Sequence, residues 1–290
     1  MRKTVLAMAI GLAVSLSGHH ADAGSVLDGV KARGQLVCGL GNPTAGFMQA
    51  DRQGKWTGFA VDICRAVAAA VLRDASKVKF VSLSAAQRFP ALQAGQVDLL
   101  VANSTYTLSR DSGQEVEFTG IYYYDGQGFL VKRSGAKNVK DLHRANICFQ
   151  SATTTEANLA DYFRAQKIRF TAFPFDRMDE ALAAFLAGRC EALTADISAL
   201  HAIRAGNAQH AQAYAVLAQA ISKEPFSPSV RQGDDQFADI VRWTLFAMIE
   251  AEEYRESYDR NLGDGSPLRI RRSLNALRTK PGILYVPPIR

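Results

Sequence analysis

Three polar segments each follow an apolar run with the composition of a β-strand, and their side chains can bind the charged groups of a small molecule. In the first segment, residues 103–111, Arg110 carries a planar guanidinium that can hold a carboxylate through two parallel hydrogen bonds. Asn103 and Thr105 lie just beyond the predicted strand 97–102, where open α/β sheets bind their ligands. The alternative is a surface arginine paired with Asp111.

The second and third segments offer complementary groups. Thr153 and Glu156 have the spacing of a capping box, which marks a helix N-terminus, and Thr154 lies in the same turn. Free N–H groups at such a terminus attract anions. Asp196 ends the apolar run 192–195, where its carboxylate can bind an ammonium group or cap the next helix. Each feature has an ordinary structural explanation, but together they match a zwitterionic α-amino acid.

The elements that must position these residues follow an alternating pattern. Short apolar runs alternate with helical periodicity, which is typical of βαβ units and mostly parallel sheets. The first block has predicted strands at 35–39, 78–83, 97–102 and 127–132 and helices at 61–72 and 89–94. The second has predicted strands at 147–150, 170–173 and 192–195 and helices at 155–166, 179–187 and 197–204. Asp234 or Asp235 caps a later helix.

Two such blocks, with the chain leaving the second to finish elsewhere, predict an α/β protein of two Rossmann-like lobes joined by two crossing strands. We predict that residues 24–131 and 223–263 form the first lobe and residues 132–222 the second. The segment 222–225 serves as a connector. Residues 264–290 form a basic C-terminal segment.

The first residues predict export. Arg2 and Lys3 precede an apolar run at 5–16, and small residues at Ala21 and Ala23 provide a cleavage site. This is the plan of a secretory signal peptide occupying residues 1–23, and the run is too short to span a bilayer. No cysteine stands at the cleavage point to carry a lipid anchor. We therefore expect a soluble, exported mature protein.

The charge of the chain argues against nucleic-acid binding. The formal net charge is +6, and removal of residues 1–23 leaves +5. The segment 264–290 alone carries six basic residues against one acidic residue, so the body between is neutral. Nucleic-acid binding usually requires a basic face across the fold.

Four cysteines in an exported chain favour disulfides, although three connectivities are possible and spacing alone does not choose among them. The two-block layout places Cys38 and Cys64 in one lobe and Cys148 and Cys190 in the other. We therefore predict the pairs Cys38–Cys64 and Cys148–Cys190. No CxxC pair or nearby histidine suggests zinc, and we expect neither a metal nor a cofactor.

Several segments together carry a family resemblance that covers nearly the whole mature chain. They are residues 58–62 (GFAVD), 88–98 (RFPALQAGQVD), 105–111 (TYTLSRD), 123–129 (YYDGQGF), 153–156 (TTTE) and 231–236 (RQGDDQ), with the four cysteines. The sequence resembles the polar-amino-acid solute-binding proteins of bacterial ABC transporters (family 3), most closely the general L-amino-acid-binding subgroup.

The resemblance implies a periplasmic protein of the type II periplasmic-binding-protein fold that closes on an L-amino acid and delivers it to an inner-membrane ABC permease. It implies that Arg110 clamps the ligand α-carboxylate with Thr105, Thr153 and Thr154. Asp196 and the carbonyl of Asn103 would bind the ammonium group. Residues 41–44 would border the side-chain pocket, and a monomer is expected.

The sequence departs from the family at three places. Ala60 replaces an acid, which we interpret as a surface change, and Ala85 replaces an aromatic residue found over the ligand in narrow-specificity relatives. The open pocket wall at Ala85 favours a broad ligand range. Several dozen residues that close family members carry between Tyr254 and Gly265 are absent.

Three other functions remain as alternatives. A periplasmic dehydratase on the same fold needs an acid to protonate a leaving hydroxyl, and the three segments contain no suitable carboxylate besides Asp196. A ligand-sensing partner of a receptor would share the fold and site. A nucleotide-binding oxidoreductase is disfavoured, because residues 39–44 (GLGNPT) lack the third glycine of a dinucleotide-binding turn. The histidines His143, His201 and His210 have no metal-ligand spacing and are expected at the surface.

Overall fold

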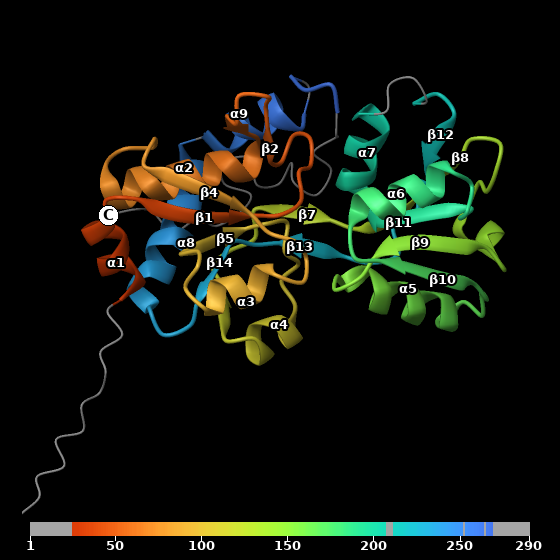
Figure 1. The fold of residues 1–290 in the computed structure, drawn as a ribbon, viewed down its shortest axis with the longest axis horizontal. Helices are drawn as coiled ribbons and strands as arrows, with labels where there is room; N and C mark the ends of the chain where they lie inside the picture. Colours follow the sequence, from red (N-terminus) through yellow and green to blue (C-terminus); the bar gives the residue numbers. More distant parts are fainter. Residues whose placement is uncertain (1–24, 207–210, 252, 264, 269–290) are drawn as a thin grey trace, which may run out of the picture.

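Two five-stranded sheets, each covered by helices, form the body of the molecule (Figure 1). The computed structural model describes residues 25–206, 211–251, 253–263 and 265–268. The predicted signal peptide and all but four residues of the basic C-terminal segment lie outside the described residues. Within the described part no helix is long and apolar enough to cross a membrane.

The first sheet has the strand order β4-β1-β5-β14-β6. Strand β1 (Leu36–Leu40) runs parallel to β4 (Val78–Ser82) and β5 (Leu99–Val101). Strand β14 (Ser229–Arg231) returns antiparallel between β5 and β6 (Val116–Phe118). The chain therefore leaves this sheet after β6 and comes back to complete it.

Helices cover both faces of the first sheet. One face carries α1 (Val26–Arg33), α2 (Phe59–Leu72), α8 (Asp235–Glu250) and α9 (Glu253–Asn261), and a short hairpin of β2 (Gln49–Ala50) and β3 (Trp56–Thr57) adjoins α2. The other side carries α3 (Arg88–Gln93) and α4 (Leu108–Gly113). Asp234 caps α8 by accepting a hydrogen bond from the Phe237 N–H at 3.0 Å, which resolves the predicted choice between Asp234 and Asp235.

The second sheet has the order β10-β9-β11-β8-β12, formed by residues 171–175, 146–150, 192–196, 127–132 and 214–216 respectively. Alternate residues of β8 face opposite sides, as the pleat requires. Phe129 and Val131 pack with α5 (Thr154–Ala165), whereas Leu130 packs with α6 (Met178–Leu186) and α7 (Ile197–Gly206). A short 3-10 helix, Val139–Leu142, follows β8.

Two antiparallel strands connect the sheets, as the sequence predicts. Strand β7 (Tyr123–Asp125) pairs with β13 (Glu224–Phe226) in the region between the two sheets (Figure 1). The predicted boundary at residues 131 and 132 falls inside β8, which pairs with β11 and β12 of the second sheet. We therefore propose that the first crossing between lobes lies in β7, and that the predicted connector at 222–225 leads directly into the returning strand β13.

Both predicted disulfides are confirmed. Cys38 of β1 pairs with Cys64 of α2, and Cys148 of β9 pairs with Cys190, which precedes β11. Each bridge joins a strand to a neighbouring element of the same sheet-and-helix unit. Neither bridge therefore restricts movement of one unit relative to the other.

Candidate functional site

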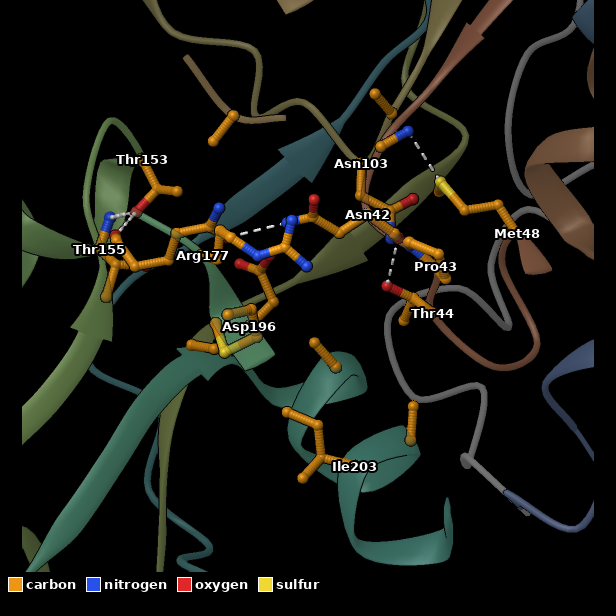
Figure 2. A pocket seen from close by; sticks show the side chains of 18 of the residues that line it. Asn42, Pro43, Thr44, Met48, Asn103, Thr153, Thr155, Arg177, Asp196 and Ile203 are labelled. Atoms are coloured by element: carbon orange, nitrogen blue, oxygen red, sulfur yellow. Dashed lines mark hydrogen bonds between the residues drawn. The ribbon is translucent and has the colours of Figure 1, made fainter. Parts of the chain in front are cut away.

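A cavity of about 430 Å³ lies where the two sheet-and-helix units face each other. This volume is in the range of about 300–1,000 Å³ that encloses whole small molecules. Figure 2 shows Asn42, Pro43 and Thr44 on one side of the cavity and Thr153 and Arg177 on the other. The wall is formed by residues 41–45, 48, 83, 85, 88, 102, 103, 105, 150, 153–155, 177–179, 182, 195, 196, 199, 202 and 203.

Five of the six predicted ligand-binding residues reach the cavity wall. They are Asn103, Thr105, Thr153, Thr154 and Asp196. They come from segments far apart in the chain, yet each follows the carboxyl end of β5, β9 or β11. The topology therefore brings them together for the reason that applies to open α/β sheets in general.

Arg110 is buried behind the wall and does not line the cavity. Its side chain is 8% exposed, its Nη1 donates to the Thr105 carbonyl oxygen at 3.0 Å, and its guanidinium stacks 5.4 Å from the Phe89 ring centre. Burial lowers the pKa of Arg110, and the negative charges of Glu224 and Asp196 oppose this shift. The alternative of a surface arginine paired with Asp111 is wrong, because Asp111 instead accepts from the Phe118 N–H.

Arg88 is a second buried guanidinium that sequence reasoning missed, and it does line the cavity. It is 7% exposed, its Nη1 donates to the Ala102 carbonyl oxygen at 3.3 Å, and its Nε has no hydrogen-bond partner among the described residues. Burial and the nearby charge of Arg110 lower its pKa to about 9. A buried, incompletely bonded cation is costly, so it favours a ligand acceptor.

Asp196 keeps its carboxylate available at the end of β11. Burial, followed by repulsion from Asp125 and Glu224, raises its pKa well above the usual range. It does not cap the next helix, because Asp125 accepts from the Ser198 N–H at 3.3 and 3.4 Å and so caps α7. Burial raises the pKa of Asp125 to about 6. The structure therefore resolves the ambiguity at Asp196 in favour of an open carboxylate.

Glu224 is a buried carboxylate of β13 that no sequence pattern singles out. Its Oε2 accepts from the Thr105 hydroxyl at 2.5 Å and from the Thr154 hydroxyl at 2.9 Å. Its Oε1 accepts from Ser222 at 2.6 Å and from Asn158. Glu224 thus connects the two lobes. Since each hydroxyl has one proton, Thr105 and Thr154 can donate to a ligand only by releasing Glu224.

The N-terminus of α5 opens on the cavity as predicted. Thr153 caps the helix by accepting from the Thr155 N–H at 3.2 Å, while its own hydroxyl donates to the Gln150 carbonyl oxygen. The predicted Glu156 partner does not take part in this cap. Anion binding at this end of the cavity is therefore supported by the helix N-terminus.

Apolar side chains also line the cavity. Met178 and Leu182 of α6 and Ile203 of α7 belong to the wall, and Ala85 lies in it where the sequence predicted an open wall. The Asn42 side-chain amide donates to the Gln150 amide oxygen across the cavity at 3.0 Å, as the dashed line in Figure 2 indicates.

Two expectations of surface placement need correction. Ala60 is fully buried, and its N–H donates to the Phe47 carbonyl oxygen, so an acid here would lie inside the core. His201 is half-buried on α7, and burial lowers its pKa. His143 is exposed, and His210 lies outside the described residues. No group of acidic, histidine or cysteine residues within the described part has the arrangement of a metal site.

Comparisons with known proteins agree on one family. Residues 36–264 match the model of the family described as bacterial extracellular solute-binding proteins, family 3. The general L-amino acid-binding periplasmic protein AapJ of Rhizobium johnstonii is 39% identical over 342 aligned positions, covering 100% of both chains. The glutamate/glutamine/aspartate/asparagine-binding protein BztA of Rhodobacter capsulatus is 38% identical over 341 positions, again covering 100% of both chains.

A solved structure and the alignment length add two further findings. The ABC transporter periplasmic binding protein from Brucella ovis with glutathione bound has a TM-score of 0.88 and 40% identity, over 92% of this chain and 100% of that chain. The difference between the 342 positions aligned with AapJ and the 290 residues here means at least 52 gap positions in this chain. This agrees with the predicted absence of several dozen residues.

Proposed function

This chain belongs to family 3 of the bacterial extracellular solute-binding proteins, and we propose that its cavity encloses the ammonium and α-carboxylate groups of an L-amino acid. The protein is the periplasmic solute-binding component of an amino-acid ABC transporter. We propose that the leader is cleaved near Ala23 and that the mature protein is a monomer that passes its ligand to the permease.

The observation that carries this proposal is the charge arrangement of one enclosed space. The available carboxylate of Asp196 lies at the cavity wall, and the buried guanidiniums of Arg110 and Arg88 are electrostatically coupled to it. A zwitterion places its ammonium group beside the carboxylate and its own carboxylate beside a guanidinium. Such a ligand pairs one buried anion and one buried cation without adding net charge.

We assign the α-carboxylate to Arg110 and to the N–H groups at the start of α5. Arg110 uses one of its N–H donors on Thr105, which leaves others for a ligand oxygen. The Asn103 carbonyl and Asp196 receive the ammonium group. Asn103 is held in a left-handed conformation, φ 50°, and the Tyr122 hydroxyl donates to its amide oxygen at 2.8 Å.

The remaining wall supports a broad ligand range. Arg88 provides donors for a side-chain carboxylate or amide, whereas Met178, Leu182 and Ile203 accept apolar side chains. Different side chains can therefore use different parts of one wall. The relative AapJ is named a general L-amino acid-binding periplasmic protein, and this supports the proposal.

Closure follows from the two-strand connection. Strands β7 and β13 are the hinge, and ligand contacts made by both lobes favour the closed state in proportion to their differential binding energy. The bond from Asn42 to Gln150 and the Glu224 contacts then hold the lobes together.

The dehydratase alternative must be reconsidered, because the structure brings Asp125 and Glu224 near Asp196. Both carboxylates already accept several hydrogen bonds, Asp125 at the start of α7 and Glu224 from four side chains. We therefore propose binding without chemistry. Recovery of each bound amino acid unchanged by mass spectrometry checks this; a dehydrated product would contradict it.

A second ligand class is favoured by the charged groups of the wall. Asp196 and Arg177 both line the cavity, and the Arg177 side chain is 65% exposed. Glutathione, which carries an amino-acid head and a distant carboxylate, fits this arrangement and is bound by the Brucella ovis relative.

Calorimetric titration of ligand-stripped protein with a panel of L-amino acids and glutathione tests the proposal. We expect binding of several amino acids with different side chains, each with one site per chain. If a folded sample binds none of them, the proposed function is wrong. Binding of a single amino acid alone would instead contradict the broad range.

A further inference from the structure

The loop of residues 41–48 forms one wall of the cavity, and at Gly46 it approaches residues 261, 262 and 268. Asn42, Pro43 and Thr44 face the cavity (Figure 2). The same loop is closed by hydrogen bonds between Thr44 and Met48, with the Thr44 N–H donating to the Met48 carbonyl oxygen at 2.7 Å. Its other side packs at Gly46 against Asn261, Leu262 and Leu268, which belong to residues 257–263 and 265–268.

Gly46 is the point of closest approach between these two segments. It has a φ of 83°, and a Cβ added there would lie 2.4 Å from the Asn261 carbonyl oxygen. The same Cβ would lie 2.6 Å from a Leu268 methyl group and 2.8 Å from a Leu262 methyl group. Any side chain at Gly46 must therefore displace either the loop or residues 257–268.

Residues 257–268 are anchored firmly enough to fix the loop. The Asp62 carboxylate accepts from the Ser257 hydroxyl at 2.6 Å and from the Asn261 amide at 3.1 Å. Tyr258 is fully buried and stacks on Tyr123 of the hinge strand β7 with ring centres 6.0 Å apart. Leu262 is also fully buried in the core beneath α2.

We propose that residues 257–268 hold the loop 41–48 in place and thereby set which ligand side chains the cavity accepts. The inference rests on the proposed amino-acid-binding function. It assigns a positioning role to a segment that overlaps the region where the sequence predicts missing residues. Asn261, Leu262 and Leu268 all reach Gly46.

The role can be tested with two alanine substitutions that differ in one respect. Gly46→Ala introduces a Cβ against residues 257–268, whereas Gly54→Ala introduces one where nothing lies within 4 Å. The two glycines have nearly the same φ, 83° and 79°, so the backbone strain of alanine is matched. Gly54 lies in the exposed turn between β2 and β3, away from the cavity.

Titrations with L-glutamine and L-alanine give the readout. Because the loop borders the side-chain end of the cavity, Gly46→Ala should raise the Kd for L-glutamine by about tenfold, equivalent to about 1.4 kcal/mol. The Kd for L-alanine, whose methyl side chain is too short to depend on the loop in the same way, should change by less than about threefold. Gly54→Ala should change neither value.

A second variant pair approaches the contact from the other side. Leu268→Ala removes a side chain that contacts Gly46, and Leu108→Ala truncates a leucine that is 82% exposed. We expect the same selective loss for Leu268→Ala and no change for Leu108→Ala. Equal loss for both amino acids in Gly46→Ala and Leu268→Ala, together with a lower Tm, would show a general structural effect and overturn the inference. Unchanged affinities in both would also overturn it, whereas absence of binding by the unmodified protein would overturn the proposed function itself.

Discussion

Removal of the Arg110 guanidinium is the most direct test of how the cavity holds its ligand. Arg110 is 8% exposed and lies behind Thr105, whereas Arg88 lies at the wall with an unpartnered Nε. Our assignment gives the α-carboxylate, which all amino acids share, to Arg110. It gives the side-chain acceptor to Arg88. Substitution of the two arginines should therefore have different consequences for different ligands.

The size of the effect follows from burial. Truncating one partner of a buried, hydrogen-bonded charge pair costs about 2–5 kcal/mol, because the other charge stays desolvated. This corresponds to a loss of affinity of about 30- to 4,000-fold for Arg110→Ala. Arg110→Lys should recover little, since an ammonium group lacks the fork that binds two oxygens. Arg177→Ala is the control: this wall residue is 65% exposed and paired with Asp179, so its loss should cost less than about 1 kcal/mol.

Isothermal titration of the unmodified protein and the four variants with L-alanine and L-glutamate checks these expectations, with far-UV circular dichroism to confirm folding. Arg110→Ala should lose affinity for both ligands. Arg88→Ala should lose affinity mainly for L-glutamate, whose side chain carries the additional acceptor. If Arg88→Ala abolishes binding of L-alanine while Arg110→Ala retains it, the roles of the two arginines are reversed and the assignment is refuted.

Two further predictions concern pH and the disulfides. Burial raises the pKa of Asp125 to about 6 and that of Asp196 well above its usual range, so the folded protein holds protons that the unfolded chain releases above about pH 4, and for Asp125 this window ends near pH 6. These two groups should therefore make the unliganded protein more stable as the pH falls through that window. The affinity for amino acids should decrease over the same range, because a neutral Asp196 cannot pair with an ammonium group. Thermal unfolding and ligand titration from pH 8 to 5 would show these opposite trends, and Asp196→Asn should reduce the pH dependence of both stability and affinity. Reduction of the two disulfides, which close loops with sequence separations of 26 and 42, should lower the free energy of unfolding by roughly 3–4 kcal/mol each. Denaturant titration measures this loss, and because each bridge lies within one lobe, a change in the ligand affinity of the folded, reduced protein would contradict the layout.

Much of the fold was predictable because local patterns and global topology agree. Alternating strand and helix signals predicted the βαβ blocks, and the block layout predicted both disulfide pairs. Element ends were less certain, since tertiary contacts decide them. Strand β5 covers Leu99–Val101 rather than the predicted 97–102, and the Asp98 carboxylate just before it accepts hydrogen bonds from Arg33 and from the Val37 N–H. The lobe boundary was placed too late for the same reason: only strand pairing shows that β8 belongs to the second sheet.

The site was partly predictable. Residues at the carboxyl ends of strands carry a signal in the sequence, because parallel topology places such ends at one edge, and five of the six predicted residues reach the cavity. Arg88 and Glu224 carry no comparable signal. Arg88 sits in a helix with an ordinary apolar pattern, and Glu224 looks like part of a polar connector. Their importance comes from burial, which only packing decides.

The amino-acid sequence by itself determined the order of elements and the chemical groups available for a zwitterion, and the expected lobe layout predicted the pairing of the cysteines that the structure confirms. These properties follow from periodicity, chain layout and residue type. Tertiary structure decided which groups remain free to act. Asp125 caps α7, so Asp196 is not needed as the cap. Glu224 accepts the hydroxyl hydrogen bonds of Thr105 and Thr154. Which of these hydrogen bonds form depends on distances between segments far apart in the chain. Local sequence patterns carry no information on those distances.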